Sequence, residues 1–380
     1  MAIATGLSVA NLYYNQPLLA ELQKSFSVSV KEIGIIPTLT QLGYALGMLF
    51  LVPLGDMIER RKLVVITSVV VTGALLLAAT AQNLVTMAVA SFLIGLLTMT
   101  PQLLLPFAAH LAEPKNRGKV LGFVMSGLLI GILLSRTFSG FVGSLLGWRA
   151  VFYFASALML VLAGSLHFVL PASETSFKGS YVALLKSIVD LVKEEPILRQ
   201  ASFIGAMLFG IFSAIWATLI FLLSTPHFGY GAKEVGLFGL LGAAGAGAAP
   251  IMGRVADHKG PLYTMGLGLV MIAFSVLVLG FSATSLIGLI AAIFILDFGV
   301  QSVHVSNQTR IFALREDARS RINTVYMFCY FIGGALGSLL GSYGWNVLQW
   351  LGVTAVCAAF SLGSLLIFWL GKKSTKKYFL

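Results

Sequence analysis

Between two long apolar stretches the chain reads Val52-Pro-Leu-Gly-Asp-Met-Ile-Glu-Arg-Arg61. The apolar stretch before this segment covers residues 33–54, and the one after it covers residues 63–82. Each is about 20 residues long, the length of a helix that crosses the hydrocarbon core of a bilayer. The segment is therefore expected to be a turn between two membrane-spanning helices.

The composition of the whole chain indicates the same class of protein. Of the 380 residues, 58% are hydrophobic and 10% are charged, and the mean hydropathy is +0.94. Soluble domains are about 45–50% apolar and about 25% charged. We therefore expect an all-α integral membrane protein. Cys329 and Cys357 lie in apolar stretches without the spacing of metal ligands, so no metal or other cofactor is expected.

The apolar stretches predict twelve transmembrane helices in two groups of six. The predicted spans are 2–23, 33–54, 63–82, 85–110, 119–146, 149–170, 198–225, 234–252, 262–281, 284–311, 322–343 and 347–370. The predicted domains are an N-terminal six-helix half at 1–170, a cytoplasmic linker at 171–197, a C-terminal six-helix half at 198–370 and a cytoplasmic tail at 371–380. Within the linker, residues 181–193 have the pattern of an amphipathic helix on the membrane surface.

The distribution of Lys and Arg predicts the orientation. Of the 25 basic residues, twenty fall in the loops after even-numbered spans and in the tail, and four fall on the opposite face. Cytoplasmic loops carry this excess of Lys and Arg. Both termini and the loop between the two groups of spans are therefore expected in the cytoplasm. Because the net charge of +11 is explained by topology, no nucleic-acid partner is expected.

Three pairs of motifs recur about 200 residues apart, which indicates an internal repeat. They are Gly55-Asp56 with Gly253 to Asp257, Asn116-Arg117-Gly118 with Ala318-Arg319-Ser320, and Gly147-Trp148 with Gly344-Trp345. The two halves are therefore expected to be pseudo-symmetric and to have the same orientation in the membrane.

The loop between the second and third spans resembles the signature G-x-L-a-D-R-x-G-R-R of the major facilitator superfamily. Leu54, Asp56, Arg60 and Arg61 match it, whereas Val52 and Glu59 replace its two glycines. The resemblance covers essentially the whole chain and implies a secondary transporter of twelve helices that works by alternating access. The first span, with Asn11-Leu-Tyr-Tyr-Asn-Gln-Pro17, is similar to that of the bacterial branch that exports drugs and sugars. This resemblance implies a multi-pass protein of the bacterial inner membrane.

Two positions depart from the drug antiporters of that branch. Their fifth-span pattern, G-x-x-x-G-P-x-x-G-G, is here Gly131-Ile-Leu-Leu-Ser-Arg-Thr-Phe-Ser-Gly140, with Arg136 in place of proline. In the fourth span, Ser91 stands where those antiporters carry an intramembrane Arg. Arg136 is expected to take over that role.

Asp297 and Arg136 are the acid and the base predicted deep within spans. A charged side chain at the bilayer centre costs about 2.5–3.5 kcal/mol even on the lenient insertion scale, so each is a functional candidate. At 1.5 Å per residue, Asp297 lies about 18 Å and Arg136 about 15 Å from the outer ends of their spans. We hypothesise that they pair in at least one state; a purely structural pair is the alternative.

A polar stripe surrounds Asp297 in the tenth span. Asp297, Gln301, His304 and Gln308 follow helical spacing and lie on one face, whereas Asn307 lies off that face. Lipid cannot satisfy such groups, so the stripe must face protein or water. Asp297 is predicted to carry a proton and His304 to relay it, with Arg136 as counter-charge. For His304 alone, a packing role is the alternative.

Further polar and aromatic residues are predicted to bind substrate. Asn11, Tyr14 and Asn15 cluster in the first span beside Pro17, which is expected to kink it. The other predicted substrate-binding residues are Gln41, Gln102, Arg136, Trp216, Gln301, Gln308, Asn323 and Tyr326. The alternative for each is a structural helix–helix hydrogen bond, worth about 0.6 kcal/mol in membranes.

A cytoplasmic gate is predicted from the charged loop motifs. Its residues are Asp56, Arg60, Arg61, Arg117, Asp257 and Arg319. Pairs between such charges bias an equilibrium between two states, although a single surface pair contributes only about 0–1 kcal/mol.

These observations predict a proton-coupled exporter of a small organic molecule. Its expected partners are that molecule, protons and the lipid bilayer, and it is expected to be monomeric. The alternative is an importer or facilitator of an anionic metabolite, with Arg136 as anion anchor; a non-transporting membrane receptor is more remote. No set of nucleophile, base and oxyanion donors can be assembled, and no P-loop lysine is present, so we expect neither an enzyme nor ATP-driven transport.

Overall fold

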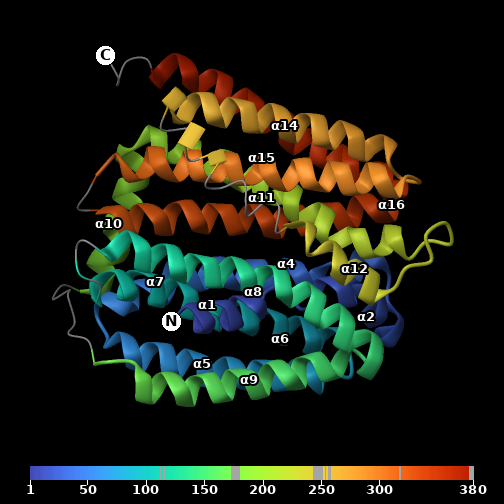
Figure 1. Cartoon of the computed structure of the whole chain (residues 1–380), viewed down its shortest axis with the longest axis horizontal. Coiled ribbons are helices and arrows are strands. Elements are labelled where there is room, and N and C mark those ends of the chain that lie inside the picture. The colour runs from blue at the N-terminus through green and yellow to red at the C-terminus, as the bar shows by residue number, and fades with distance from the viewer. Residues whose placement is uncertain are drawn as a thin grey trace. The chain divides into compact units, whose positions relative to one another are not determined.

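The computed structural model describes residues 1–111, 113, 116–172, 180–242, 251–252, 254–255, 258–315 and 318–375. At Asp56 and at residues 109–110, 117–119 and 372–375 it describes the backbone alone. Over these ranges the protein is helical and contains no strand, as the sequence predicts for an all-α membrane protein (Figure 1). Asp257, one of the predicted gate residues, lies outside the described residues.

The chain divides into two compact units. Unit 1 comprises Met1–Val28, Ile35–Leu184 and Tyr230–Leu240, and unit 2 comprises Ser29–Gly34, Leu185–Gly229 and Leu241–Leu380. Two short segments, Ser29–Gly34 and Tyr230–Leu240, thus belong to the unit formed mainly by the other half of the sequence. They lie where the predicted second and eighth spans begin and just before them.

In unit 1 the long helices pack in pairs. α4 contacts α6, α5 contacts α9, and α8 contacts both α1 and α12 (Figure 1). The elements are α1 (Ala2–Ala10), η1 (Gln16–Leu18), α2 (Leu19–Phe26), α4 (Ile35–Phe50), η2 (Val52–Asp56), α5 (Arg60–Ala79), α6 (Leu84–Leu97), α7 (Thr100–Leu111), α8 (Arg117–Leu146), α9 (Trp148–Val169) and α12 (Ala232–Phe238).

Unit 2 is also built from long helices that pack in pairs. α11 contacts α16 along its length, α14 contacts α15, and the short α3 contacts α16. The elements are α3 (Val30–Ile33), α11 (Pro196–Leu223), α14 (Pro261–Phe281), α15 (Leu286–Phe312) and α16 (Arg319–Thr375). The predicted amphipathic segment forms α10 (Tyr181–Glu194), on which Leu184, Ile188 and Leu191 share one buried face.

The first predicted span is not one regular helix. After α1 the chain turns through residues 11–15 into the 3-10 helix η1, which contains Pro17, and then into α2. Leu12 donates to Val9 and Leu18 donates to Asn15, so the hydrogen bonds here join residues three apart. Pro17 has no N–H to continue an α-helix, which explains the expected kink. Asn11, Tyr14 and Asn15 therefore lie in a tighter turn than the predicted α-helical face.

α16 comprises two helices joined at a sharp kink, and the kink lies near the junction of the last two predicted spans. At the bend Gln349 has φ 51° and ψ −138°, outside the helical region. Gly344 and Gly352 touch across the bend, where a side chain on either would strike the other's backbone. Nine helices in the described ranges are long and apolar enough to cross a membrane, this bent one counted once. The number twelve stays a prediction.

Small residues bring the helix backbones into contact at matching places in the two units. In unit 1, Gly131 of α8 lies against Gly6 of α1. In unit 2, Gly333 of α16 lies against Ala206 of α11, and 202 residues separate Gly131 from Gly333. The internal repeat therefore extends from the loop motifs to the packing of the helices.

Candidate functional site

The polar stripe of α15 lies in unit 2. Because α15 is an unbroken helix, Asp297, Gln301, His304 and Gln308 share one face, as predicted. Asp297 is buried, with 4% of its surface exposed, whereas the other three side chains are half-buried. The stripe thus combines a buried carboxyl group with three partly accessible polar groups.

His304 and Tyr326 join this stripe to α16. The His304 Nδ1 atom lies 3.0 Å from the Tyr326 hydroxyl, and the Tyr326 side chain is fully buried. Asn307, from the neighbouring face of α15, donates from Nδ2 to the backbone oxygen of Ala201 in α11 at 3.3 Å. Polar groups therefore connect α15 to α16, which follows it in sequence, and to the more distant α11.

An aromatic cluster extends from His304 along α11, and most of its members were missed by sequence reasoning. His304 lies 5.0 Å from Tyr330 between ring centroids, and Tyr330 stacks on Phe209 at 4.2 Å. Phe209 stacks on Phe212 at 5.5 Å, which in turn lies 5.9 Å from Trp216. The spacing of Phe209, Phe212 and Trp216 by three and four residues is the signal that could have revealed this face of α11.

In unit 1 the broken first span presents its polar groups to α4. Asn15 donates from Nδ2 to the Thr40 hydroxyl at 3.1 Å. Asn11 is 3% exposed, and neither its Nδ2 nor its Oδ1 has a hydrogen-bond partner among the described residues. A buried amide without a partner is costly. Asn11 therefore has unused capacity to bind water or a substrate.

Gln41 and Gln102 take different positions in unit 1. Gln102 donates from Nε2 to the Tyr44 hydroxyl at 3.0 Å, which joins α7 to α4. Gln41 is buried in α4, and its Oε1 has no partner among the described residues. Tyr44 was not predicted as a site residue.

Arg136 is held by two residues that the sequence did not single out. Its Nε donates to Gln16 Oε1 at 2.7 Å, and its guanidinium carbon lies 4.9 Å from the centroid of the Tyr13 ring. Arg136 is 1% exposed. A charge-assisted hydrogen bond and a cation–π contact together lower the cost of a buried cation. Arg136 lies in unit 1 and Asp297 in unit 2, and their pairing stays a hypothesis.

The described gate residues have local partners. Arg60 donates from Nε to the Gly55 oxygen at 3.2 Å, and Arg319 donates from Nε to the Phe312 oxygen at 3.1 Å. Arg61 pairs with Glu59 at 3.2 Å. Glu59 replaces a glycine of the superfamily signature, so the acid that pairs with Arg61 comes from the same loop. The side chains of Asp56 and Arg117, and the whole of Asp257, lie outside the described residues.

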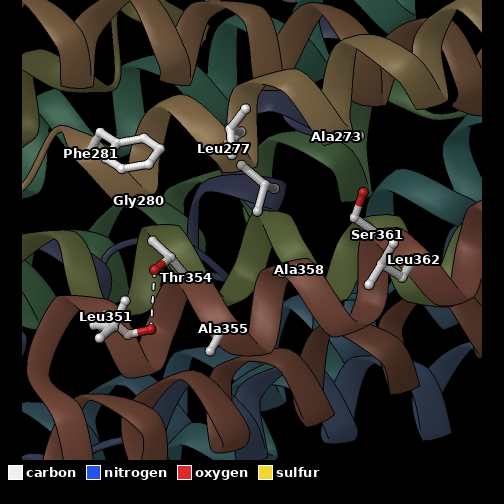
Figure 2. A pocket seen from close by; sticks show the side chains of 11 residues that line it. Ala273, Leu277, Gly280, Phe281, Leu351, Thr354, Ala355, Ala358, Ser361 and Leu362 are labelled. Atoms are coloured by element: carbon white, nitrogen blue, oxygen red, sulfur yellow. Dashed lines mark hydrogen bonds between the residues drawn. The ribbon is translucent and has the colours of Figure 1, made fainter.

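Figure 2 shows a cavity of about 390 Å³ in unit 2 that none of the predicted site residues lines. It lies between α14 and the second part of α16, and Leu277 and Phe281 face it from α14. The Thr354 hydroxyl at its edge donates to the Leu351 oxygen at 3.1 Å. With so few polar groups, this cavity suits hydrocarbon and not a polar substrate.

Comparison with known proteins identifies the family. The sequence profile described as Major Facilitator Superfamily matches residues 1–337 and, in a second match, residues 250–379. The chain belongs to the major facilitator superfamily. This major facilitator protein is 45% identical over 371 residues to a putative uncharacterized transporter, YgaY, of Escherichia coli K12, covering 98% of this chain and 94% of the relative.

Other relatives of this major facilitator protein are also named as transporters. It is 34% identical to a probable transporter of Streptomyces coelicolor over 94% of this chain and 84% of that protein. It is 22% identical to a probable sugar efflux transporter of Helicobacter pylori over 93% and 88%. The protein is therefore a transporter and not an enzyme, and as a multi-pass protein with bacterial homologues it belongs in the inner membrane.

Solved structures confirm the major facilitator fold. The bacterial homologue of the human lysosomal transporter Spinster, in its inward-facing and unoccupied conformation, superposes with a TM-score of 0.79 at 15% identity, covering 99% of this chain and 96% of that one. A variant of the nucleoside transporter NupG superposes with a TM-score of 0.73 at 15% identity, covering 97% and 98%.

Proposed function

We propose that this transporter exports a small organic molecule by alternating access and couples the export to protons. The observation that carries the proposal is the buried Asp297 on a membrane-spanning helix whose same face bears Gln301, His304 and Gln308. Intramembrane acids of this kind mark ion and proton pathways. The name of the Helicobacter relative supports the export direction.

In this proposal Asp297 takes up and releases the proton. His304, whose Nδ1 atom lies 3.0 Å from the Tyr326 hydroxyl, either relays the proton or acts as a pH sensor. Arg136 acts as a counter-charge, and the amides of Asn11, Gln41, Gln301 and Gln308 offer hydrogen bonds to the substrate. Both termini and the charged loops at Arg60, Arg61 and Arg319 face the cytoplasm.

Proton movement in liposomes tests the proposal. The purified protein is reconstituted with a pH-sensitive dye inside, and sugars, amino acids and lipophilic drugs are added outside in turn. We expect proton flux that depends on the substrate and that falls at least tenfold in Asp297→Asn. Transport that continues without proton flux would make the protein a facilitator and remove Asp297 as the carrier.

A second candidate function is uptake of an anionic metabolite on Arg136. It is favoured by the way Gln16 and Tyr13 orient the guanidinium within unit 1. Because a lysine keeps the charge, Arg136→Lys should retain part of the import of an anion, whereas Arg136→Gln should abolish it. Full activity of Arg136→Gln with a carboxylate substrate would exclude this function.

A further inference from the structure

The Tyr326 hydroxyl lies in the interior of unit 2, where its hydrogen needs an acceptor. The Tyr326 side chain is 0% exposed, and its hydroxyl lies 3.0 Å from His304 Nδ1. The ring packs against α11 at Gly205, where a Cβ would lie 2.8 Å from Tyr326 Cε2. The missing side chain at Gly205 therefore makes room for the ring, and the hydroxyl has to find its partners among the neighbours it has there.

Asn307 supplies a hydrogen to the Tyr326 oxygen. The orientation of its amide is given by Ala201, because the backbone oxygen 3.3 Å away can only accept and must face the NH₂ group. The Asn307 side chain also hydrogen-bonds the Tyr326 hydroxyl, while its Oδ1 has no partner among the described residues. The bond to Tyr326 therefore comes from Nδ2, which has a hydrogen for each of the two oxygens.

Only His304 Nδ1 is left to accept the hydrogen of the Tyr326 hydroxyl. Among the described residues this hydroxyl has no hydrogen-bond partner other than His304 and Asn307. A buried donor without an acceptor is costly. Tyr326 therefore donates to Nδ1, and the neutral imidazole carries its own hydrogen on Nε2.

The surroundings of His304 do not favour a charged ring. A hydrogen on Nδ1 would leave the Tyr326 hydrogen without its acceptor. The titratable groups that face the ring from α16 are Tyr326 and Tyr330, and α11 contributes the apolar Phe209 to the same cluster. In the part of the chain that the structure describes, no carboxylate lies within salt-bridge distance of the imidazole, and Asp297 is about two turns away on α15.

The Nε2 atom reaches the accessible side of the ring. His304 is half-buried whereas Tyr326 is fully buried, so the accessible edge of the imidazole lies away from Nδ1. Nε2 has no partner among the described residues, and it is not sealed from solvent as Asn307 Oδ1 is. An N–H donor on the same face as Gln301 and Gln308 is placed to bind an acceptor atom of a ligand.

We propose that Tyr326 and Asn307 are positioning residues that keep His304 neutral with its hydrogen on Nε2, and that His304 donates this hydrogen to an acceptor oxygen or nitrogen of the substrate. The inference rests on the proposed function and narrows it. Asp297 alone then carries the proton, His304 binds the substrate, and the substrate class is one with a hydrogen-bond acceptor that meets His304.

NMR of the purified protein, with isotope-labelled histidine ring nitrogens, tests the tautomer without any substrate. The two ring nitrogens resonate far apart in a neutral imidazole and close together in an imidazolium. His304→Gln identifies the signals of His304, because they are missing from its spectrum. We expect wild-type His304 to stay neutral, with its hydrogen on Nε2, between pH 5 and 8.

Tyr326→Phe and Asn307→Leu should admit the second tautomer or the imidazolium, because Nδ1 loses its donor or the donor loses its orientation. Tyr343→Phe is the matched control and should leave the spectrum unchanged, since Tyr343 is 50% exposed and has no contact with His304. A hydrogen on Nδ1 or an imidazolium in the wild-type spectrum would overturn the inference, whether or not the variants fold. So would a Tyr326→Phe spectrum equal to that of the wild type.

His304→Leu and His304→Gln test the role in binding. We expect His304→Leu to raise the KM of the transported compound at least tenfold, and His304→Gln to raise it less, because glutamine keeps an N–H donor. The number of protons moved per substrate should stay the same in both, because Asp297 carries the proton. A variant that still moves substrate but no longer moves protons would make His304 a relay, and an unchanged KM in His304→Leu would remove it from the binding site.

The two measurements separate this inference from the proposed function. Substrate-dependent proton flux together with a charged His304 would leave the export function standing and overturn the inference. Wild-type protein that moves none of the sugars, amino acids and lipophilic drugs would overturn the proposed function, and with it the substrate-binding role of His304, whatever the spectrum shows.

Discussion

The hydrogen bond that Gln16 accepts offsets part of the free-energy cost of burying Arg136. Its Oε1 accepts the Arg136 Nε at 2.7 Å, and both side chains are almost completely buried. A hydrogen bond to a charged group contributes about 1.5–3 kcal/mol, and a buried donor left without an acceptor adds the cost of its desolvation. The role proposed for Arg136 in transport therefore depends on a neutral neighbour from another helix.

Gln16→Ala is expected to lower the free energy of unfolding by about 2 kcal/mol, because the Arg136 Nε loses its acceptor. Thermal unfolding of the purified protein in detergent measures the change. Gln41→Ala is the control, since Gln41 is also a buried glutamine but its Oε1 has no partner among the described residues. Equal losses in the two variants would contradict the assigned role of Gln16.

Tyr326→Phe is expected to reduce transport at least tenfold and to change its pH dependence. The substitution removes the hydroxyl 3.0 Å from His304 Nδ1 and keeps the ring. Transport by reconstituted protein between pH 5 and 8 is the measurement, with Tyr343→Phe as control because Tyr343 is 50% exposed and lies outside the candidate site. An unchanged pH profile would show that the hydroxyl takes no part in coupling.

At the scale of the elements, the close contact of α1 with α8 depends on glycine. Gly131 faces the Gly6 backbone, and a side chain there would strike it. Without side chains between them, two helices approach closely enough for extensive dispersion contacts, which replace the hydrophobic effect as the driving force in lipid. The same arrangement of Gly333 and Ala206 holds α16 against α11.

Gly131→Ala is therefore expected to destabilise the protein by about 2 kcal/mol or more, as overpacking does in a tight interface. Gly122→Ala on the same helix is the matched control, because a Cβ at position 122 would have no neighbouring heavy atom within 4 Å. Alanine is the better helix former, so Gly122→Ala should be neutral or mildly stabilising. Thermal unfolding of both variants would refute the argument if Gly122→Ala were the more harmful.

In the repeated Gly-Trp motifs, glycine is required for a different physical reason in each half. Gly147 ends α8 with φ 81°, a conformation that strongly favours glycine. Gly344 lies within α16 and is required by its contact with Gly352. A residue repeated in the sequence therefore does not need to have the same structural role in both halves.

At the scale of the whole molecule, the distribution of basic residues predicts the orientation in the membrane. Twenty of the 25 Lys and Arg are assigned to one face. Fusions of green fluorescent protein, which folds in the cytoplasm, and of alkaline phosphatase, which is active in the periplasm, test the assignment. Fusions after Lys62 and at the C-terminus should fluoresce, whereas a fusion after Lys31 should show phosphatase activity. The reverse pattern would invert the proposed topology.

The sequence by itself determined the class of protein, most of the long apolar helices and the repeat of about 200 residues. These follow from hydropathy and helical periodicity, which are properties of neighbouring residues. They also account for the face that Asp297, Gln301, His304 and Gln308 share, because α15 is a regular helix.

Only the tertiary structure decided which groups meet. Gln16 and Tyr13 as the partners of Arg136, the stacking of Phe209 on Tyr330, and the packing of Tyr326 against Gly205 all join helices far apart in sequence. Such contacts depend on how close two backbones come and on where a span is broken. Gly6 and Gly131 decide the first in unit 1, and the break before Pro17 is the clearest case of the second. Neither effect can be calculated from the local pattern of residues.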